Sequence, residues 1–308
     1  MGSMTFLKNA TKKLKGFLYT QRYVIGFIED FNFNQSSDDT FSKIKWVDLQ
    51  GYRKGWFADP FILSADESQI VVLAEEYLYS TKLGRIVRLS IDRNTYRLLK
   101  IEPILELPTH LSFPIYIREN GKTYLYPENY QGGALKIYEY DDSTRTLSNP
   151  ITLVSEPLLD SQILKIDGTY YIFAVKYKTG LQKDTKDLII YKASSLLGPF
   201  IPHQSIETEH NEERGAGTIF VTKYNKIIRP TQNCEYDYGK EVIFKQLELE
   251  NDAFSEIEVG RISADGNKKK GLGIHTFNQL KDLTVVDGRG FRYVVSRWIK
   301  TFINRLSR

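Results

Sequence analysis

The sequence has few of the residues that build disulfide-linked or membrane-spanning proteins. Cys234 is the only cysteine among 308 residues, so no internal disulfide can form, which argues for a reducing compartment. No run of 18 apolar residues occurs, and a helix needs about that length to cross a bilayer. The basic N-terminal stretch lacks the apolar core of a signal peptide, and residues 1–4 resemble a cloning remnant. These absences favour a cytoplasmic protein.

Common catalytic and metal-binding signatures are also missing. The sequence contains neither an HExxH motif, a calcium-binding loop nor a G-x-S-x-G element. Its four histidines are scattered along the chain: His110, His203, His210 and His275. From the sequence we therefore expect no metal and no cofactor.

The net charge of +4 is unevenly distributed. The segments Thr5–Arg22 and Phe291–Arg308 each hold five basic residues and no acid, so the tails carry +10 and the remainder carries 4 − 10 = −6. Because the body is acidic and no recognition motif occurs, we expect no nucleic acid partner.

The C-terminal tail, residues 291–308, has the pattern of a basic amphipathic helix. Its apolar residues share one helical face, with the basic residues elsewhere: Val295, Trp298, Ile299, Phe302 and Leu306. Such a helix suits an anionic membrane surface, which would make the protein peripheral to the inner face of the membrane. The alternative is a helix packed on the outside of the folded body with its charges outward.

Between the tails, short apolar and aromatic runs alternate with turns. Tyr and Phe number 20 and 17, a composition that favours strands. The runs "QIVVLAEEY", "GRIVRLSID", "KTYLYPEN", "LKIYEYD", "TYYIFAV", "DLIIYKA", "KIIRP" and "EVIFKQLEL" predict strands. The turn signals "ENGK", "IDGT" and "KYNK" between paired runs predict hairpins.

A motif recurs about every fifty residues, where a polar residue precedes an apolar strand. The steps between successive copies are 53, 48, 54 and 61 residues, and the polar residues are Asp59, Ser112, Asp160, Arg214 and His275. Fifty residues suit four short strands, or one propeller blade. The sequence therefore predicts an all-β, five-bladed β-propeller over residues 46–290, with short helical basic segments at 5–45 and 291–308. The alternative is a generic β-sandwich.

In a propeller the first strand of each blade lines the central channel. The five repeated polar residues are therefore expected to meet at one end of that channel, as a funnel of polar groups.

Five stretches resemble the N-terminal propeller domain of glucosamine inositolphosphorylceramide transferases, and related bacterial proteins from surface-polysaccharide gene neighbourhoods. They are "WFADPFIL…LAEEY…GRI", "HLSFPIYIRENGKTYLYPEN", "LLDSQILKIDGTYYIFA", "RGAGTIF…IIRPTQNCEYDYG" and "HTFN…VVDG", from about Trp56 to Gly288. More distantly, the chain is similar to the five-bladed furanosidase fold of arabinanases, invertases and levansucrases.

The distant resemblance implies catalytic roles for three residues. It implies that Asp59 is a base or nucleophile, that Asp160 tunes it, and that Glu213 is the acid, although Glu213 matches weakly. Asn233 stands where the closer family often has an acid, so a catalytic role there is in doubt.

Other residues are candidates for sugar contacts, each with a structural alternative. Asp59 could instead cap a turn by binding backbone N–H groups, and Arg214 could hold a phosphate or pair with Asp59 or Asp160. Glu75 or Glu76 could line the funnel or lie exposed at a strand end. The predicted substrate-binding residues are Trp56, His110, Ser112, Glu128, Arg214, Gln232, Tyr238 and His275.

The segment "DGNKKKGLG" is a candidate phosphate site. Lys268, Lys269 and Lys270 are predicted to bind a diphosphate, and the alternative is a solvated surface turn.

Three functions follow as hypotheses. The first is a glycosyltransferase-like enzyme of surface polysaccharide or glycolipid biosynthesis, which moves a sugar from an activated donor to a glycan or glycolipid acceptor. The resemblance implies a furanose somewhere in that reaction. The second is a furanosidase-type glycoside hydrolase, and the third is a non-catalytic glycan-binding propeller.

Overall fold

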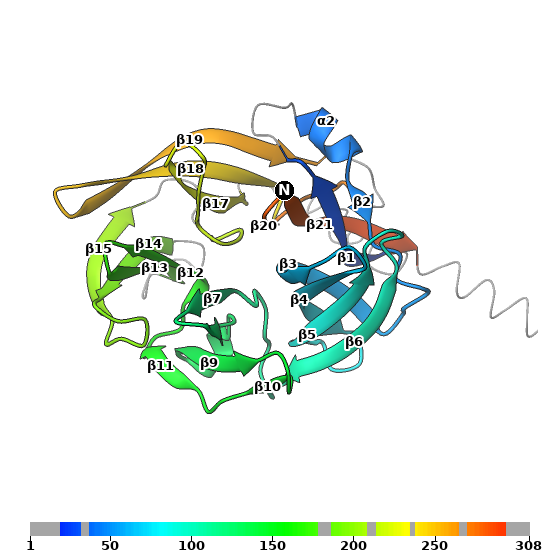
Figure 1. Ribbon diagram of the computed structural model, residues 1–308, viewed down its shortest axis with the longest axis horizontal. Helices are drawn as coiled ribbons and strands as arrows, with labels where there is room; N and C mark the ends of the chain where they lie inside the picture. The colour runs from blue at the N-terminus through cyan, green and yellow to red at the C-terminus, as the bar shows by residue number, and fades with distance from the viewer. Residues whose placement is uncertain are drawn as a thin grey trace, which may run out of the picture.

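Five antiparallel sheets surround a central axis (Figure 1), so the predicted five-bladed propeller is confirmed. The computed structural model describes residues 19–31, 37–177, 186–207, 214–234, 238–264 and 270–293. Every run predicted as a strand overlaps an observed strand. Within the described residues, no helix is long and apolar enough to cross a membrane.

Each of the first four blades is one continuous stretch of chain. Blade one holds β3 (Gly55–Ala65), β4 (Gln69–Leu78), β5 (Leu83–Asp92) and β6 (Leu98–Leu105). Blade two holds β7 (Tyr116–Glu119), β8 (Lys122–Leu125), β9 (Leu135–Asp141), β10 (Thr146–Leu147) and β11 (Ile151–Val154), with the 3-10 helix η1 (Tyr130–Gly132) after β8. Blade three holds β12 (Leu159–Ile166), β13 (Thr169–Tyr177), β14 (Lys186–Ala193) and β15 (Ile201–Glu207). Blade four holds β16 (Phe220–Val221), β17 (Ile227–Asn233), β18 (Glu241–Glu250) and β19 (Ala253–Ser263).

Blade five joins the two ends of the chain and closes the ring. Its strand order is β2-β1-β21-β20, with β20 (Phe277–Leu280), β21 (Leu283–Tyr293), β1 (Tyr19–Glu29) and β2 (Lys45–Trp46). β1 pairs with β21 from Tyr19↔Tyr293 to Glu29↔Leu283. A ring closed in this way has no free edge at the junction of the first and last blades.

The predicted limits of the propeller therefore need correction at both ends. Tyr19–Glu29 were placed in a helical N-terminal segment, which is wrong, because they form a strand whose two faces are both covered. Ile25 and Phe27 pack against blade one, whereas Ile28 packs against blade four. The only helix described in that segment is α2 (Ser37–Ser42). At the other end β21 extends to Tyr293, and residues 294–308 of the predicted amphipathic helix lie outside the described residues.

The hydrophobic core lies between neighbouring blades. Phe61 of blade one meets Phe113 of blade two edge to face at 5.1 Å, and Phe244 of blade four meets Phe277 of blade five at 4.8 Å. Burying one such side chain contributes about 1.5–3 kcal/mol. The blades are thus held by apolar contacts on their faces, and the channel between them is left to polar groups.

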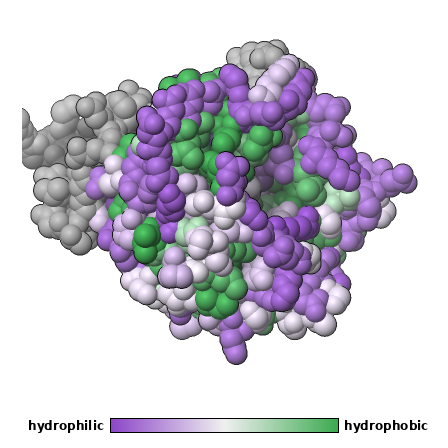
Figure 2. All heavy atoms as spheres, turned by 60° about the vertical axis from the view of Figure 1, so that its left-hand side comes forward, coloured by the Kyte–Doolittle hydropathy of each residue, from purple (hydrophilic) through white to green (hydrophobic). Residues whose placement is uncertain are grey.

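Apolar side chains also reach the outer surface of blades three and four. Figure 2 shows hydrophobic residues in green among purple hydrophilic ones on the side that contains these blades. The most exposed include Ile201 and Ile257, with 63% and 52% of their surface accessible. Scattered apolar residues are ordinary on protein surfaces, so they support no functional argument.

Candidate functional site

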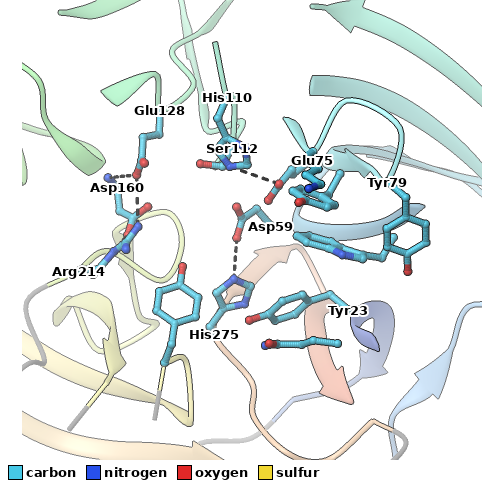
Figure 3. A pocket seen from close by; sticks show the side chains of 15 residues that line it. Tyr23, Asp59, Glu75, Tyr79, His110, Ser112, Glu128, Asp160, Arg214 and His275 are labelled. Atoms are coloured by element: carbon cyan, nitrogen blue, oxygen red, sulfur yellow. Dashed lines mark hydrogen bonds and ion pairs between the residues drawn. The ribbon is translucent and has the colours of Figure 1, made fainter. Parts of the chain in front are cut away.

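One end of the channel opens into a cavity of about 640 Å³. All five residues of the predicted repeat line it: Asp59, Ser112, Asp160, Arg214 and His275. Figure 3 shows them pointing toward one another from different blades. The expectation that residues far apart in the sequence meet at one place is thus met.

Asp59 and Asp160 reach the cavity from the same kind of backbone distortion. Each has a positive φ, 49° and 41° respectively, at a register shift between the first two strands of its blade. A non-glycine residue rarely adopts this conformation, and a bulge re-aims a side chain that a regular strand would direct elsewhere. The same backbone conformation therefore directs both carboxylates into the channel.

Blade two corrects one detail of the repeat. The residue with the equivalent backbone is Phe113, with φ 47°, and a proline follows it as one follows Asp59. Ser112 is its neighbour and pairs with Glu128 through an isolated bridge. The polar repeat is thus shifted by one position in this blade.

An acidic side chain of the preceding blade accepts the backbone N–H of each of these distorted residues. Phe113 N donates to Asp59 Oδ2 at 2.9 Å, and Asp160 N donates to Glu128 Oε2 at 2.9 Å. Asp59 N donates to Asp287 Oδ2 at 3.1 Å. Asp59 therefore binds a backbone N–H group, as the structural alternative predicted, and it also lines the cavity.

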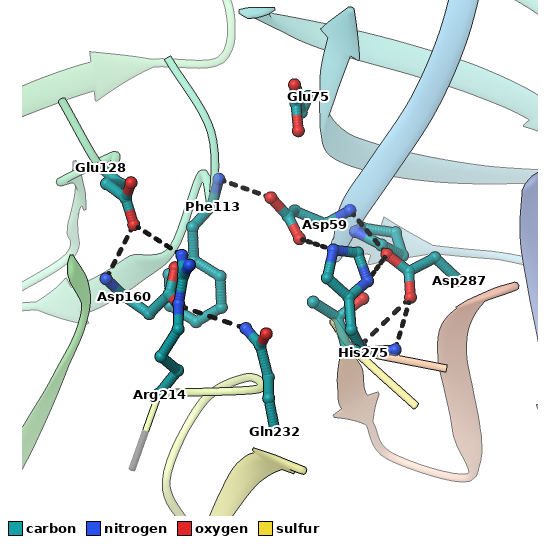
Figure 4. A network of polar contacts seen from close by, with 12 residues as sticks. Asp59, Glu75, Phe113, Glu128, Asp160, Arg214, Gln232, His275 and Asp287 are labelled. Carbon is teal, nitrogen blue, oxygen red and sulfur yellow. Dashed lines mark hydrogen bonds and ion pairs between the residues drawn. The ribbon is translucent and has the colours of Figure 1, made fainter. Parts of the chain in front are cut away.

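Asp59, His275 and Asp287 form a chain of polar contacts at one side of the cavity (Figure 4). His275 Nε2 lies 3.3 Å from Asp59 Oδ1, and His275 Nδ1 lies 2.7 Å from Asp287 Oδ2. Asp287 Oδ1 also accepts the backbone N–H groups of His275 and Thr276 at 3.1 Å each. The imidazole is therefore fixed between two carboxylates.

These contacts determine the charges of the three groups. Burial raises the pKa of Asp59 to about 6; the His275 charge opposes this shift, while the nearby Asp287 and Asp160 carboxylates add to it. Burial alone would lower the pKa of His275, but Asp287 and Asp59 outweigh it and raise that pKa. Near neutral pH, His275 is an imidazolium and Asp59 lies close to its own titration point.

Asp160 has different partners on the opposite side of the cavity. Arg214 Nε donates to Asp160 Oδ2, and Gln232 Nε2 donates to the same oxygen at 3.2 Å. Arg214 Nη2 also lies 3.4 Å from Glu128 Oε2. Burial disfavours the Asp160 charge, but Arg214 overcomes this penalty and lowers the pKa of Asp160. Glu128 has a pKa raised well above normal by burial and by Asp160, an effect that Arg214 only partly offsets.

The acidic pair in "AEEY" is divided between two environments. Glu75 lines the cavity and is 4% exposed, whereas Glu76 accepts hydrogen bonds from Arg85 and Tyr52. Successive residues of β4 point to opposite faces, so only one of the two acids can face the funnel.

Aromatic rings form part of the cavity wall. Trp56 stacks on Tyr77 with ring centroids 4.7 Å apart and an interplanar angle of 7°, and Tyr23 stacks on His275 at 4.6 Å. Across the opening, the Arg214 guanidinium lies 5.3 Å from the ring centroid of Tyr238. Aromatic surface beside convergent polar groups is typical of a sugar-sized ligand site.

Several predicted site residues lie elsewhere. Gln232 is buried behind Asp160 and holds its carboxylate, so it does not line the cavity. Lys270 lies 5.1 Å over the Trp46 ring on the outer strand β2, away from the funnel. The predictions for Glu213, Lys268 and Lys269 fall outside the described residues. His110 and Trp56 do line the cavity.

Among the described residues, one group of side chains has donor atoms close enough together for a metal ion. These are Asp59, His275 and Asp287, whose donor atoms all lie within 4.8 Å of one another. However, both ring nitrogens of His275 already face carboxylates. We therefore interpret the group as a chain of ion pairs and derive no metal chemistry from it.

Sequence reasoning missed three contributors to the site. Tyr23 and Gln21 line the cavity from β1, which the basic N-terminal charge pattern had placed outside the propeller. Asp287, which is fully buried, occurs in "VVDG" at the opposite end of the chain. An unpaired acid among apolar strand residues was the available signal, but its partner His275 could be identified only from the fold.

The fold defines the class of this protein as a five-bladed β-propeller. A thermostable family-43 glycoside hydrolase superposes with a TM-score of 0.53 at 14% identity, covering 71% of this chain and 82% of that one. A family-43 β-1,3-galactosidase determined with galactodeoxynojirimycin gives 0.51 at 12% identity, covering 70% and 81%. At these identities the likeness concerns the fold alone.

The family is more specific than the fold. Residues 43–288 match the family described as "Glucosamine inositolphosphorylceramide transferase 1, N-terminal", and the chain belongs to this family. It is 27% identical to glucosamine inositolphosphorylceramide transferase 1 of Oryza sativa subsp. japonica over 68% of this chain and 28% of the relative. For the Arabidopsis thaliana protein the identity is 26%, over 77% and 33%. The chain thus spans about a third of the length of these relatives.

Proposed function

We propose that the funnel is a glycosyl-transfer site, in which a sugar moves from a donor to a hydroxyl of a glycan or glycolipid acceptor. The observation that carries this proposal is Asp59, a buried carboxylate that faces the cavity and has a pKa of about 6. A general base works best when its pKa lies near the working pH. Kinship with proteins named as transferases supports the same class of reaction.

In this proposal each carboxylate has a separate role. Asp59 accepts the proton of the acceptor hydroxyl, and the neighbouring imidazolium of His275 keeps the carboxylate in place. Asp160, which is held ionised by Arg214, binds sugar hydroxyls and adds negative potential where positive charge develops on the sugar ring.

For the donor sugar we propose an amino sugar with a free ammonium group. The relatives carry glucosamine in their name, and that name describes proteins about three times as long as this chain. Asp160, which Arg214 holds ionised, lines the cavity and is the proposed partner of that ammonium group.

The test of this function is a panel of donors offered with and without acceptor alcohols. The donors are nucleotide sugars and aryl glycosides of glucosamine, N-acetylglucosamine, glucose and arabinofuranose, and the chains are the wild type, Asp59→Asn and Asp167→Asn. The matched control Asp167 is an exposed turn aspartate. Acceptor-dependent product is expected, with a loss of about 10²–10⁴-fold in Asp59→Asn alone. Sugar binding without turnover in any chain would contradict the proposal and leave a glycan-binding propeller.

Hydrolysis is the second candidate, and a specific observation favours it. The raised pKa values of Glu75 and Glu128 keep two carboxylic acids at the cavity wall, and a glycoside hydrolase pairs an acid with a base. Release of free sugar at the same rate with and without acceptor would favour hydrolysis over transfer.

The cellular location is a separate proposal. The basic tails, most of which lie outside the described residues, would hold the protein at the cytoplasmic face of an anionic membrane. Co-flotation with anionic but not neutral vesicles, and its loss at high salt, is the expected result. Binding to neither kind of vesicle would contradict this proposal.

A further inference from the structure

Glu75 differs from the other acids of the funnel in that no cation holds it. Its side chain is 5% exposed, and within the described part of the chain Glu75 Oε1 has no hydrogen-bond partner. Figure 3 shows the carboxyl group facing the cavity from blade one, beside His110 and Ser112. A buried polar oxygen without a partner is costly, which marks it as a group kept for a ligand.

The surroundings of Glu75 leave room for its carboxyl group and position a histidine beside it. A Cβ on Gly84 would lie 2.6 Å from Glu75 Oε1 and 2.9 Å from His110 Cε1, so only glycine fits there. Gly84 N donates to His110 Nδ1 at 2.9 Å, which places the proton of a neutral His110 on Nε2. That nitrogen lies 3.5 Å from Glu75 Oε1, and the ring is 35% exposed. His110 therefore links Glu75 to solvent.

Carboxylates of its own blade and of three other blades favour the protonated form of Glu75. After burial, the largest contributions that raise its pKa come from Asp59, Glu128, Asp287 and Asp160. His110 beside it has a pKa lowered by burial, so it is neutral, and Lys82 and Tyr23 line the same cavity. Burial and the nearby carboxylates thus favour the protonated form of Glu75, whereas the Arg214 guanidinium keeps Asp160 ionised.

We propose that Glu75 is the proton donor to the leaving group, and that the donor is a glycoside with an alcohol leaving group rather than a sugar phosphate. This inference rests on the proposed glycosyl transfer. A departing alkoxide needs a proton, whereas a departing phosphate does not. In addition, Arg214 contacts Asp160 and Glu128, and His275 lies between Asp59 and Asp287, so a diphosphate would have to compete with carboxylates for both buried cations.

The step balances in atoms and charge. The bond between the anomeric carbon and the leaving oxygen breaks, the electron pair stays on that oxygen, and the proton of Glu75 neutralises it. The acceptor oxygen bonds to the anomeric carbon and gives its proton to Asp59. The cycle closes when Asp59 releases a proton to solvent and Glu75 regains one from solvent in the cavity.

The test compares two leaving groups on the same sugar. Methyl and 4-nitrophenyl glycosides of glucosamine and of arabinofuranose are offered to the wild type, Glu75→Gln and Glu67→Gln. The control Glu67 is an exposed acid in the turn of the same hairpin. In Glu75→Gln we expect a loss of about 10²–10⁴-fold with the methyl glycoside and much less with the nitrophenyl glycoside, whose leaving group needs no proton. In the wild type the rate should fall at high pH, because Glu75 loses its proton. This fall should be absent in Glu75→Gln. Thermal unfolding reports whether each variant is folded.

The outcomes separate this inference from the function on which it rests. Turnover of nucleotide sugars alone, unchanged in Glu75→Gln, would overturn the inference and leave glycosyl transfer standing. Equal losses with both leaving groups would make Glu75 a positioning residue and also overturn it. Failure of the folded wild type to process any donor would overturn both.

Discussion

Asp59 and Asp160 occupy equivalent places in blades one and three, yet their partners differ. Both sit at a bulge with a left-handed backbone, and both are almost fully buried. Asp160 contacts Arg214, which is charged at every relevant pH, whereas Asp59 contacts His275, which titrates. Burial disfavours the charged form of both. Arg214 outweighs burial and lowers the pKa of Asp160, whereas His275 only partly offsets it, so the pKa of Asp59 is raised to about 6.

The backbone thus only positions each carboxylate, and the neighbouring cation decides its chemistry. A permanently ionised acid suits binding and electrostatic stabilisation, whereas an acid that titrates near neutrality suits proton transfer. The same fold element supplies both kinds of group within one cavity.

The largest expected effect comes from removing the cation on the Asp160 side. Arg214→Met leaves Asp160 buried without its charged partner, and loss of such a partner destabilises a protein by about 3–5 kcal/mol. Urea unfolding at neutral pH measures the change. Lys122→Met, which removes an ion pair with both side chains about half exposed, is the control and should change little. Equal stability of the two variants would mean that Arg214 does not hold Asp160 in its charged form.

A second, intermediate effect concerns the fall of kcat/KM at low pH, which we expect to report the protonation of Asp59. Because the pKa of Asp59 is about 6, the rate should fall about tenfold for each pH unit below that value. His275→Gln removes the cation that lowers this pKa, so this fall should move to higher pH. The measurement is kcat/KM from pH 4.5 to 8.5. If the fall of kcat/KM occurs at the same pH in His275→Gln as in the wild type, it reports the titration of another group.

The smallest effect is the contribution of His275 to stability. Its folded pKa is raised above the usual 6.5, so its contribution is fully present below pH 6.5 and is lost as the pH rises through the folded value. A tenfold change in proton affinity between the folded and unfolded chain corresponds to about 1.4 kcal/mol. Unfolding free energies at pH 5.5 to 9 should therefore decline more steeply in the wild type than in His275→Gln. Parallel curves would contradict the raised pKa.

Much of this arrangement could be predicted from the sequence. The fifty-residue spacing placed Asp59, Asp160, Arg214 and His275 at strand heads, and all four line one cavity. The spacing could not decide whether Ser112 or Phe113 occupies the repeat position in blade two. A shift of one residue hardly changes a spacing of about fifty residues, but it turns the side chain at that position to the opposite face of the strand.

Two further features could not be predicted. Tyr19–Glu29 looked like part of a basic tail, because charge composition carries no record of a strand partner some 260 residues away. The pair Glu75 and Glu76 looked alike, because either register of β4 was open until β3 and β5 fixed which acid faces the cavity.

Local patterns of apolar and turn residues were enough to set the number of blades and to single out the acid in "WFADPFIL", because such patterns indicate where most strands begin and end. The identity of the charges that stand beside one another came from the folded ring: His275 with Asp59, Arg214 with Asp160 and, among the residues that the structure describes, no cation with Glu75. A pKa depends on burial and on charges a few ångströms away. In a closed ring of blades, those charges come from distant parts of the chain.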